Sequence, residues 1–122
     1  MEYSNQFIAN LDEMDDPCTL EFSGSHSGWP FRGFLVHWQG KVHAYANTCP
    51  HAGHALNLFD NRFFNKDQTL LICSSHGALF QPETGLCVAG PCLGKKLSPL
   101  ICRVENNKVY VRTPNTVEEE RY

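Results

Sequence analysis

Two short stretches of the sequence each pair a cysteine with a histidine. Cys49 and His51 are one residue apart in the first stretch, and Cys73 and His76 are two residues apart in the second. Thiolate sulfur and imidazole nitrogen are ligands for soft and borderline metal ions. Each stretch therefore offers two such ligands, and 21 residues separate His51 from Cys73. If the two stretches are loops that meet in space, they supply four ligands to one metal centre.

This ligand set leaves two kinds of centre open, zinc and an iron–sulfur cluster. A zinc finger normally pairs Cys-x2-Cys with a second pair of ligands that lies on a helix. Here each pair mixes cysteine with histidine, and no apolar period of 3.6 residues appears after residue 16. A zinc-stabilised β domain used for binding remains an alternative, which a colourless protein that contains one zinc would establish.

Short apolar segments separated by turn residues lead into both stretches. They predict three hairpins: residues 34–38 with 41–46, 62–64 with 68–72, and 101–104 with 109–112. The first hairpin runs directly into Cys49, and the second ends at Cys73. The hairpins would thus deliver both ligand loops to one place without a helix.

The remaining segments complete an all-β interpretation. Residues 1–17 predict at most a short strand and a helical turn, and Thr19–Phe22 predicts a strand. We expect residues 24–28 to form a loop, because small polar residues cannot pack a core. Residues 86–88 predict a short strand, which Gly90-Pro91 interrupts. The predicted fold class is a small antiparallel β-sandwich or barrel, in one domain that spans residues 1–122 with a mobile tail over 114–122.

Charge and composition limit the classes of partner that the protein can have and the cellular compartment in which we expect it. The net charge is −3, with acidic residues concentrated near both ends, which argues against nucleic acid as a partner. The sequence begins without a basic or apolar leader, and no apolar run reaches the ~20 residues that cross a bilayer. We therefore expect a soluble, cytoplasmic protein with no membrane partner. In that reducing compartment the cysteines outside the two stretches are expected to be free, partly buried thiols: Cys18, Cys87, Cys92 and Cys102.

The two stretches resemble the signature of the Rieske family. The motifs are Cys-x-His-x-Gly-x-x-Leu and Cys-x-x-His-Gly-x-x-Phe, and eight positions of this sequence agree with them: Cys49, His51, Gly53, Leu56, Cys73, His76, Gly77 and Phe80. Thr84-Gly85 and Gly90-Pro91 resemble the turn and the proline loop that covers the family's cluster. The 21-residue interval is somewhat longer than the commonest one in the family, and we assign the excess to the hairpin over residues 63–69.

The resemblance implies one [2Fe-2S] cluster per chain, bound by residues 47–92. Cys49 and Cys73 would hold one iron, and His51 and His76 would hold the other. Two histidines in place of two thiolates make the cluster less negative, so that it accepts an electron more readily. Four positions near the ligands indicate the low end of the family's potential range, since they lack the loop disulfide and the hydroxyl groups of the high-potential members: His54, Ser75, Ala78 and Phe80.

The implied function is that of a soluble Rieske-type ferredoxin of an aromatic-ring dioxygenase system. Such a protein is a monomeric electron carrier and not an enzyme, and it passes electrons from a flavin-dependent ferredoxin reductase to a terminal oxygenase. No further motif for a mononuclear iron site is present, since the other histidines stand apart: His26, His37, His43 and His54. A second interpretation within the same family is the small Rieske-like subunit of a nitrite reductase.

Overall fold

The computed structural model describes residues 3–26, 29–50, 55–57, 61–74 and 77–114. Its regular structure is almost entirely β, and every pair of strands is antiparallel. The elements are β1 (Tyr3–Asn10), the 3₁₀ turn η1 (Leu11–Glu13), β2 (Cys18–His26), β3 (Trp29–Trp38), β4 (Lys41–Ala46), β5 (Leu71–Ile72), β6 (Leu79–Phe80), β7 (Cys87–Ala89), β8 (Pro99–Leu100), β9 (Cys102–Glu105) and β10 (Lys108–Pro114). The predicted all-β fold class is confirmed.

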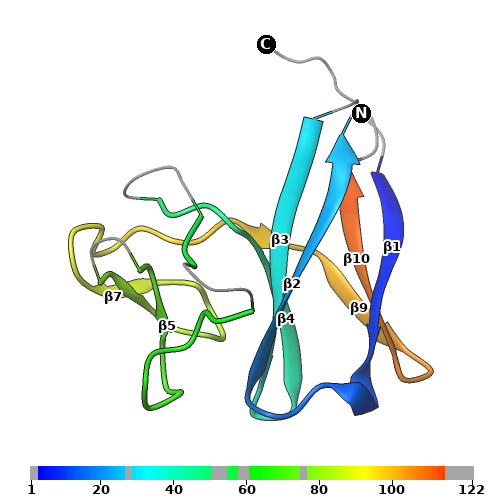
Figure 1. Cartoon of the computed structure of the whole chain (residues 1–122), viewed down its shortest axis with the longest axis horizontal. Coiled ribbons are helices and arrows are strands. Elements are labelled where there is room, and N and C mark those ends of the chain that lie inside the picture. The colour runs from blue at the N-terminus through cyan, green and yellow to red at the C-terminus, as the bar shows by residue number, and fades with distance from the viewer. Residues whose placement is uncertain (1–2, 27–28, 51–54, 58–60, 75–76, 115–122) are drawn as a thin grey trace.

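Within the described residues the strands form three sheets. Their orders are β1-β10-β9, β2-β3-β4-β8 and β5-β6-β7. Figure 1 shows the first two sheets together on one side of the molecule, with the short strands β5 and β7 set apart on the other. The chain enters this smaller unit after β4 and leaves it before β8, so that β4 leads to the first ligand loop and β5 to the second.

The four-stranded sheet is covered on both faces, and the run Phe34-Leu35-Val36 shows why. All three residues are fully buried although successive side chains of a strand point to opposite faces. Leu35 belongs to a core with Val109 and Val111 of β10. Phe34 and Val36 belong to a second core, which is shared with the β5–β7 unit. A continuous apolar run is what a strand buried on two sides requires.

Most of the predicted hairpins are confirmed, with shifts at their ends. The turn at Gln39-Gly40 joins β3 to β4, and Asn106-Asn107 joins β9 to β10. The second hairpin contains less strand than expected, because residues 65–70 form a polar turn and β5 begins only at Leu71. Asn65 makes this turn by accepting hydrogen bonds from the backbone N–H groups of Thr69 and Leu70.

Two expectations about the first part of the chain were wrong. The described part of the loop predicted over residues 24–28, residues 24–26, is strand, with Gly24 opposite Phe31 and His26 opposite Trp29, and residues 27–28 lie outside the described residues. Small polar residues are compatible with strands here because backbone pairing with β3 does not require large side chains. The first segment is an eight-residue strand, not a short one, and β10 pairs with it along its length. The tail predicted to be mobile lies almost entirely outside the described residues.

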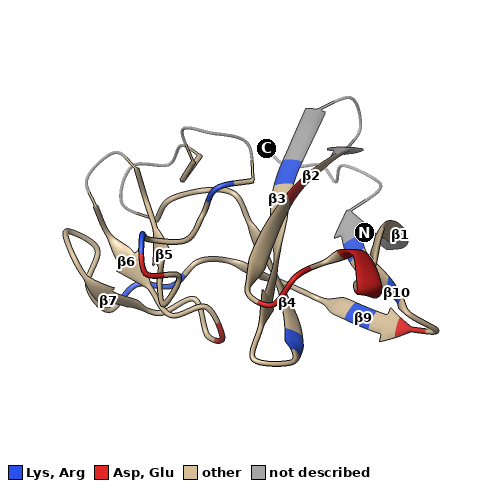
Figure 2. Cartoon of the chain, turned by 60° about the horizontal axis from the view of Figure 1, so that its bottom comes forward, with Lys and Arg blue, Asp and Glu red and all other residues tan. Residues whose placement is uncertain are grey.

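Acidic residues near the N-terminus lie away from the ligand loops. Figure 2 shows them on the turn after β1, beside β10 and opposite the β5–β7 unit. The side chains of Asp12 and Glu13 are exposed there. The part of the chain that the structure describes contains no helix with the length and hydropathy of a membrane-spanning segment.

Candidate metal centre

The first ligand loop leaves the end of β4 through a fixed backbone turn. The N–H of Asn47 donates to the carbonyl oxygen of Arg32 at 3.0 Å, and the N–H of Thr48 donates to that of Ala46 at 2.9 Å. Cys49 follows with only 1% of its surface exposed. The strand end and the turn thus direct the Cys49 side chain into the core and not toward solvent.

A buried asparagine holds the two ends of the first loop together. Asn47 is 5% exposed, and its Oδ1 accepts the N–H of Leu56 at 2.9 Å. Its Nδ2 donates to Asn57 at 3.0 Å and to a carboxylate oxygen of Glu21 at 3.2 Å. Asn57 also donates to Glu21, and Arg32 pairs with the same carboxylate. The loop is therefore closed at its base and tied to strands β2 and β3.

The negative charge of the Glu21 carboxylate is stabilised by the groups that donate hydrogen bonds to it. Burial raises the pKa of Glu21, but hydrogen bonds from Arg32, Asn57 and Asn47 and the charge of Arg32 outweigh it and leave the pKa below its ordinary value of 4.5. The carboxylate is consequently ionised at neutral pH, as two amide donors and a guanidinium require.

The second ligand loop is a tight turn between β5 and β6. The N–H of Cys73 donates to the carbonyl oxygen of Ala78, and the N–H of Gly77 donates to that of Cys73, both at 2.9 Å. Gly77 has a φ of +74°, a conformation that favours glycine. Cys73 is fully buried. The motif glycine is thus required by the turn itself.

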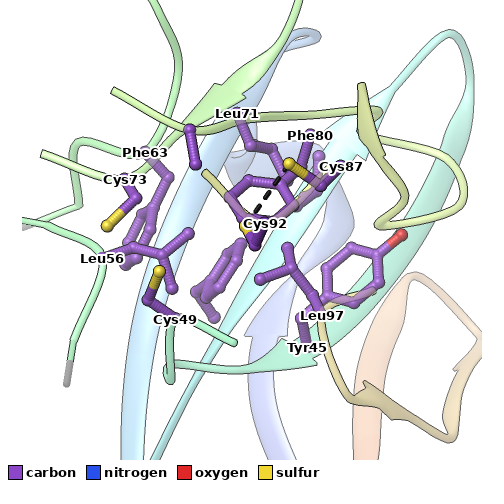
Figure 3. Packing of buried hydrophobic residues seen from close by; sticks show 13 residues of the cluster. Tyr45, Cys49, Leu56, Phe63, Leu71, Cys73, Phe80, Cys87, Cys92 and Leu97 are labelled. Carbon is purple, nitrogen blue, oxygen red and sulfur yellow. Dashed lines mark hydrogen bonds between the residues drawn. The ribbon is translucent and has the colours of Figure 1, made fainter. Parts of the chain in front are cut away.

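The two loops are bonded to each other. The N–H of Ser74 donates to the carbonyl oxygen of Leu56 at 2.8 Å. Cys49, Leu56 and Cys73 belong to one core cluster, and Figure 3 shows Leu56 between the two cysteines. The structure therefore brings the two predicted thiol ligands to the same place, although 23 residues lie between them in the sequence.

Aromatic side chains form the floor of this site. Phe34 of β3 stacks on Phe63 with ring centroids 4.0 Å apart and an interplanar angle of 10°, and Tyr45 packs against Phe34 at 5.8 Å. The Tyr45 hydroxyl donates to the carbonyl oxygen of Pro82 at 2.8 Å, and burial raises its pKa. Phe63, between the two ligand loops, and Pro82, after the second, are thereby both fixed to the central sheet.

The segment predicted to cover the site packs against the second loop. A Cβ atom on Gly90 would lie 2.7 Å from the Cα of Ala78, and Gly90 has a φ of +101°. Only a residue without a side chain permits this approach. Gly90 therefore lies directly against Ala78, which follows the loop that carries Cys73, and the covering role expected for Gly90-Pro91 stays a prediction.

The four cysteines outside the ligand loops are thiols, as predicted, but two of them meet. Cys87 and Cys92 are buried, whereas Cys18 and Cys102 are half-buried. The Sγ atoms of Cys87 and Cys92 are 3.3 Å apart. Burial, the contact with Cys87 and the nearby Cys49 and Cys73 raise the pKa of Cys92 to about 12. Sequence reasoning missed this pair, and only its Cys-x4-Cys spacing could have suggested it.

The predicted histidine ligands, His51 and His76, lie outside the described residues, as do His54 and Ser75. Within the described ranges, no group of three or more His, Cys, Asp or Glu side chains is arranged to hold a metal ion. The other described histidines have separate positions. His37 lies within 3.1 Å of the carbonyl oxygens of Met14 and Asp15, and burial lowers the pKa of His43.

The described donors fit an iron–sulfur cluster. A buried thiolate is costly unless a cation binds it. Cys49 and Cys73 are both buried and share a core, so a centre bound between the loops would supply that cation to both. The surrounding apolar side chains would keep water from the sulfur ligands. The network that closes the first loop was not predicted, because nothing in the sequence relates Asn47 or Asn57 to Glu21.

Comparison with known proteins supplies an independent finding. The family model for the Rieske [2Fe-2S] domain matches residues 5–113. No functionally curated protein matches the sequence.

Solved structures with this fold include free-standing ferredoxins. The ferredoxin of carbazole 1,9a-dioxygenase from Nocardioides aromaticivorans IC177 superposes with a TM-score of 0.66 at 21% identity, over 92% of this chain and 99% of its own. The Sphingomonas yanoikuyae B1 ferredoxin gives 0.67 at 19% identity, over 91% and 100%. The terminal oxygenase of carbazole 1,9a-dioxygenase from Novosphingobium sp. KA1 gives 0.69 at 19% identity, but this chain covers only 32% of it.

Proposed function

Because the chain belongs to the Rieske [2Fe-2S] family, whose domain holds one [2Fe-2S] cluster, we propose that it is a carrier of single electrons. The observation that supports this most directly is the convergence of the two ligand loops, with Cys49 and Cys73 buried in one core and Ser74 bonded to Leu56. The cluster supplies a one-electron couple when it is bound. The chain's own residues bind it, orient it and exclude water.

The ligands of the proposal are Cys49 and Cys73 for one iron and His51 and His76 for the other. The two cysteines approach from the apolar core, where no solvent competes for their sulfur atoms. The histidines would complete the set from the same two loops. An imidazole ligand keeps a proton on its outer ring nitrogen, and we expect that proton to couple reduction to pH under alkaline conditions.

The cluster-binding part spans residues 47–92 of one domain that extends over residues 1–122. Support comes from the core that the β5–β7 unit shares with the four-stranded sheet. Because Phe34 and Val36 of that sheet complete the core around the ligand loops, this part depends on the rest of the chain for its floor. We expect it not to fold alone.

The potential should lie near the low end of the family's range. Ala78 and Phe80 are buried beside the second loop and carry no hydroxyl group that could stabilise the reduced state. Histidine-ligated [2Fe-2S] centres cover roughly −150 to +300 mV, and we expect a midpoint below about +100 mV for this one.

The partners of the proposal are a flavin-dependent ferredoxin reductase and a terminal oxygenase, and the protein acts as a cytoplasmic monomer. The similar structures include ferredoxins that this chain matches over nearly their full length, which favours a free-standing carrier over an enzyme. Among the described residues, no group of three or more His, Cys, Asp or Glu side chains is arranged as a mononuclear iron site. Substrate chemistry would therefore take place on the oxygenase.

The test is reconstitution with purified partners. The holoprotein should accept one electron per chain from a flavin-dependent reductase and reoxidise when a terminal oxygenase and oxygen are added. Potentiometry in the same preparation should give a reversible one-electron couple. Purification in a permanent complex with a sirohaem subunit would instead assign it to a nitrite reductase. A colourless protein with one zinc and no acid-labile sulfide would overturn both assignments.

A further inference from the structure

Cys87 and Cys92 are positioned for a chemical step that electron transfer does not use. Their Sγ atoms are 3.3 Å apart, and the Cys92 thiol donates to the Cys87 sulfur (Figure 3). The Cys87 thiol in turn donates to the carbonyl oxygen of Ala89 at 3.2 Å. A disulfide joins sulfur atoms about 2.05 Å apart, so small rotations of the two side chains would permit a bond.

The two thiols lie at the base of the turn over residues 87–92, called the covering turn here because its Gly90 packs against Ala78 beside the second ligand loop. Cys87 begins β7, and Cys92 follows Gly90-Pro91, which packs against Ala78. A bond between the two sulfur atoms would close this turn into a ring. The ring would hold Gly90 against the loop that carries Cys73.

The covering turn also offers a route to the buried sulfur atoms. Cys87 and Cys92 are 1% and 2% exposed, whereas the next side chain, Leu93, is 68% exposed. Four backbone hydrogen bonds restrain this end of the turn: Leu93 N–H to Gly90 at 3.3 Å, Gly94 N–H to Cys87 at 3.1 Å, Lys95 N–H to Cys92 at 2.9 Å and Cys87 N–H to Lys95 at 2.8 Å. A local opening of this short turn, in which these bonds break together, would expose the pair while the two large sheets stay paired.

We propose that Cys87 and Cys92 form a reversible redox modification site, in which a low-molecular-weight disulfide converts the two thiols into an intramolecular disulfide that fastens the covering turn. The two thiols lose two protons and two electrons, and one sulfur–sulfur bond forms. One cysteine attacks the external disulfide as its thiolate and displaces the first thiol, and the second cysteine then attacks the mixed disulfide and displaces the other. The external disulfide thereby accepts the two electrons and two protons and leaves as two thiols. The cluster takes no part in this exchange.

The test of the bond uses the native holoprotein and oxidised glutathione. After incubation, the protein is denatured, alkylated and digested with trypsin and a glutamate-specific protease. Cleavage after Glu83 and Lys95 isolates residues 84–95, which contain only these two cysteines. We expect this peptide to carry no alkyl group and to be lighter by two hydrogen atoms. After treatment of the same sample with a dithiol reductant, it should carry two alkyl groups.

A peptide that carries two alkyl groups after the treatment with oxidised glutathione would overturn the proposal. The oxidant would then not reach the pair in the native fold, and the pair could not be a redox modification site. Glutathione attached to a single cysteine, without the ring, would overturn it as well. Cys92→Ser should remove the mass change. Cys102→Ser is the matched control, since this half-buried thiol lies outside the pair, and it should leave the change intact.

The effect on the covering turn has its own measurement. An iron chelator should bleach the visible absorbance of the protein with the Cys87–Cys92 disulfide several-fold more slowly than that of the protein with the two free thiols. The variants Cys87→Ala and Cys92→Ser should each bleach at the same rate after oxidised glutathione and after the dithiol reductant. One of these variants, if it assembles a cluster, is enough for this control. Equal rates for the two forms of the wild type would refute the fastening. This second measurement rests on the proposed cluster, whereas the mass change does not, so the two failures are distinguishable.

Discussion

The N–H of Ser74 donates to the carbonyl oxygen of Leu56 at 2.8 Å, and this bond joins the two loops that carry the predicted ligands. Each of the two residues is linked to the cysteine of its own loop. Ser74 follows Cys73 directly, and Leu56 donates its own N–H to Asn47, two residues before Cys49. The two thiols are thus held by one continuous set of bonds that begins at the end of β4.

Replacement of Asn47 by alanine should destabilise the protein by about 1–3 kcal/mol, because the buried N–H of Leu56 would lose its acceptor. The Glu21 carboxylate would lose one donor as well. Urea unfolding followed by circular dichroism measures the change. Asn10→Ala is the matched control, since the amide of Asn10 only contacts Glu13 at the surface, at 3.3 Å. Its effect should stay within about 0.5 kcal/mol. Equal losses in the two variants would contradict the role assigned to Asn47.

Gly90→Ala should disturb the cover of the second ligand loop, and Gly94→Ala should not. Both glycines have positive φ, +101° and +88°, so each alanine carries a conformational cost of about 1–2 kcal/mol. A Cβ on Gly94 meets nothing within 4 Å, whereas one on Gly90 meets Ala78 at 2.7 Å. Gly90→Ala should therefore lose roughly 1–3 kcal/mol more and bind less iron per chain. If both variants unfold at the same urea concentration, the contact does not constrain the loop.

Stability should fall in acid, and Glu21 should account for part of the loss. Its pKa is lowered in the folded protein, so its contribution is fully present above the ordinary value of 4.5. That contribution disappears as the pH falls from there through the lowered folded pKa. The urea midpoint measured between neutral and acid pH should drop less steeply in Glu21→Gln than in the wild type. Parallel pH profiles would show that the Glu21 carboxylate is not stabilised by Arg32 and the two asparagines.

Replacement of a proposed histidine ligand should change the potential and not only the stability. His51→Cys or His76→Cys should move the midpoint toward the about −400 mV of all-cysteine plant-type clusters, or prevent assembly. His54→Ala is the control, because the proposal gives His54 no ligand role, and its midpoint should be unchanged.

In the wild type the midpoint should decline at alkaline pH as the histidine ligands lose protons. A midpoint that stays flat there would argue against imidazole ligation.

The sequence predicted the parts of this structure that depend on local pattern. The first and third hairpins follow from alternation and turn residues, and the paired motifs predicted that Cys49 and Cys73 lie in the same place. The ends of the strands did not follow, because pairing with a distant partner fixes them. β1 is long because β10 pairs with it along its length, and residues 24–26 are strand because β3 pairs with them.

Contacts between residues far apart in the sequence account for what was missed at the site. Glu21 reaches Asn47 and Asn57 across 26 and 36 positions, and no local pattern marks any of the three. The meeting of Cys87 with Cys92 depends on how the Gly90-Pro91 turn folds back on β7. Such relationships arise when separate elements pack, and a single sequence carries no direct signal for them.

Two histidines and two cysteines are proposed to hold one [2Fe-2S] cluster, and magnetic coupling between histidine nitrogen and the reduced cluster distinguishes this ligand set from an all-cysteine one. The reduced protein should be prepared with natural nitrogen and again with ¹⁵N-labelled histidine, and both samples examined by pulsed electron paramagnetic resonance. We expect two strongly coupled nitrogen nuclei, whose signals change from those of ¹⁴N to those of ¹⁵N in the labelled sample. In an assembled His76→Cys variant the number of coupled nitrogen nuclei should fall to one. A reduced cluster without coupled histidine nitrogen would contradict this ligand set.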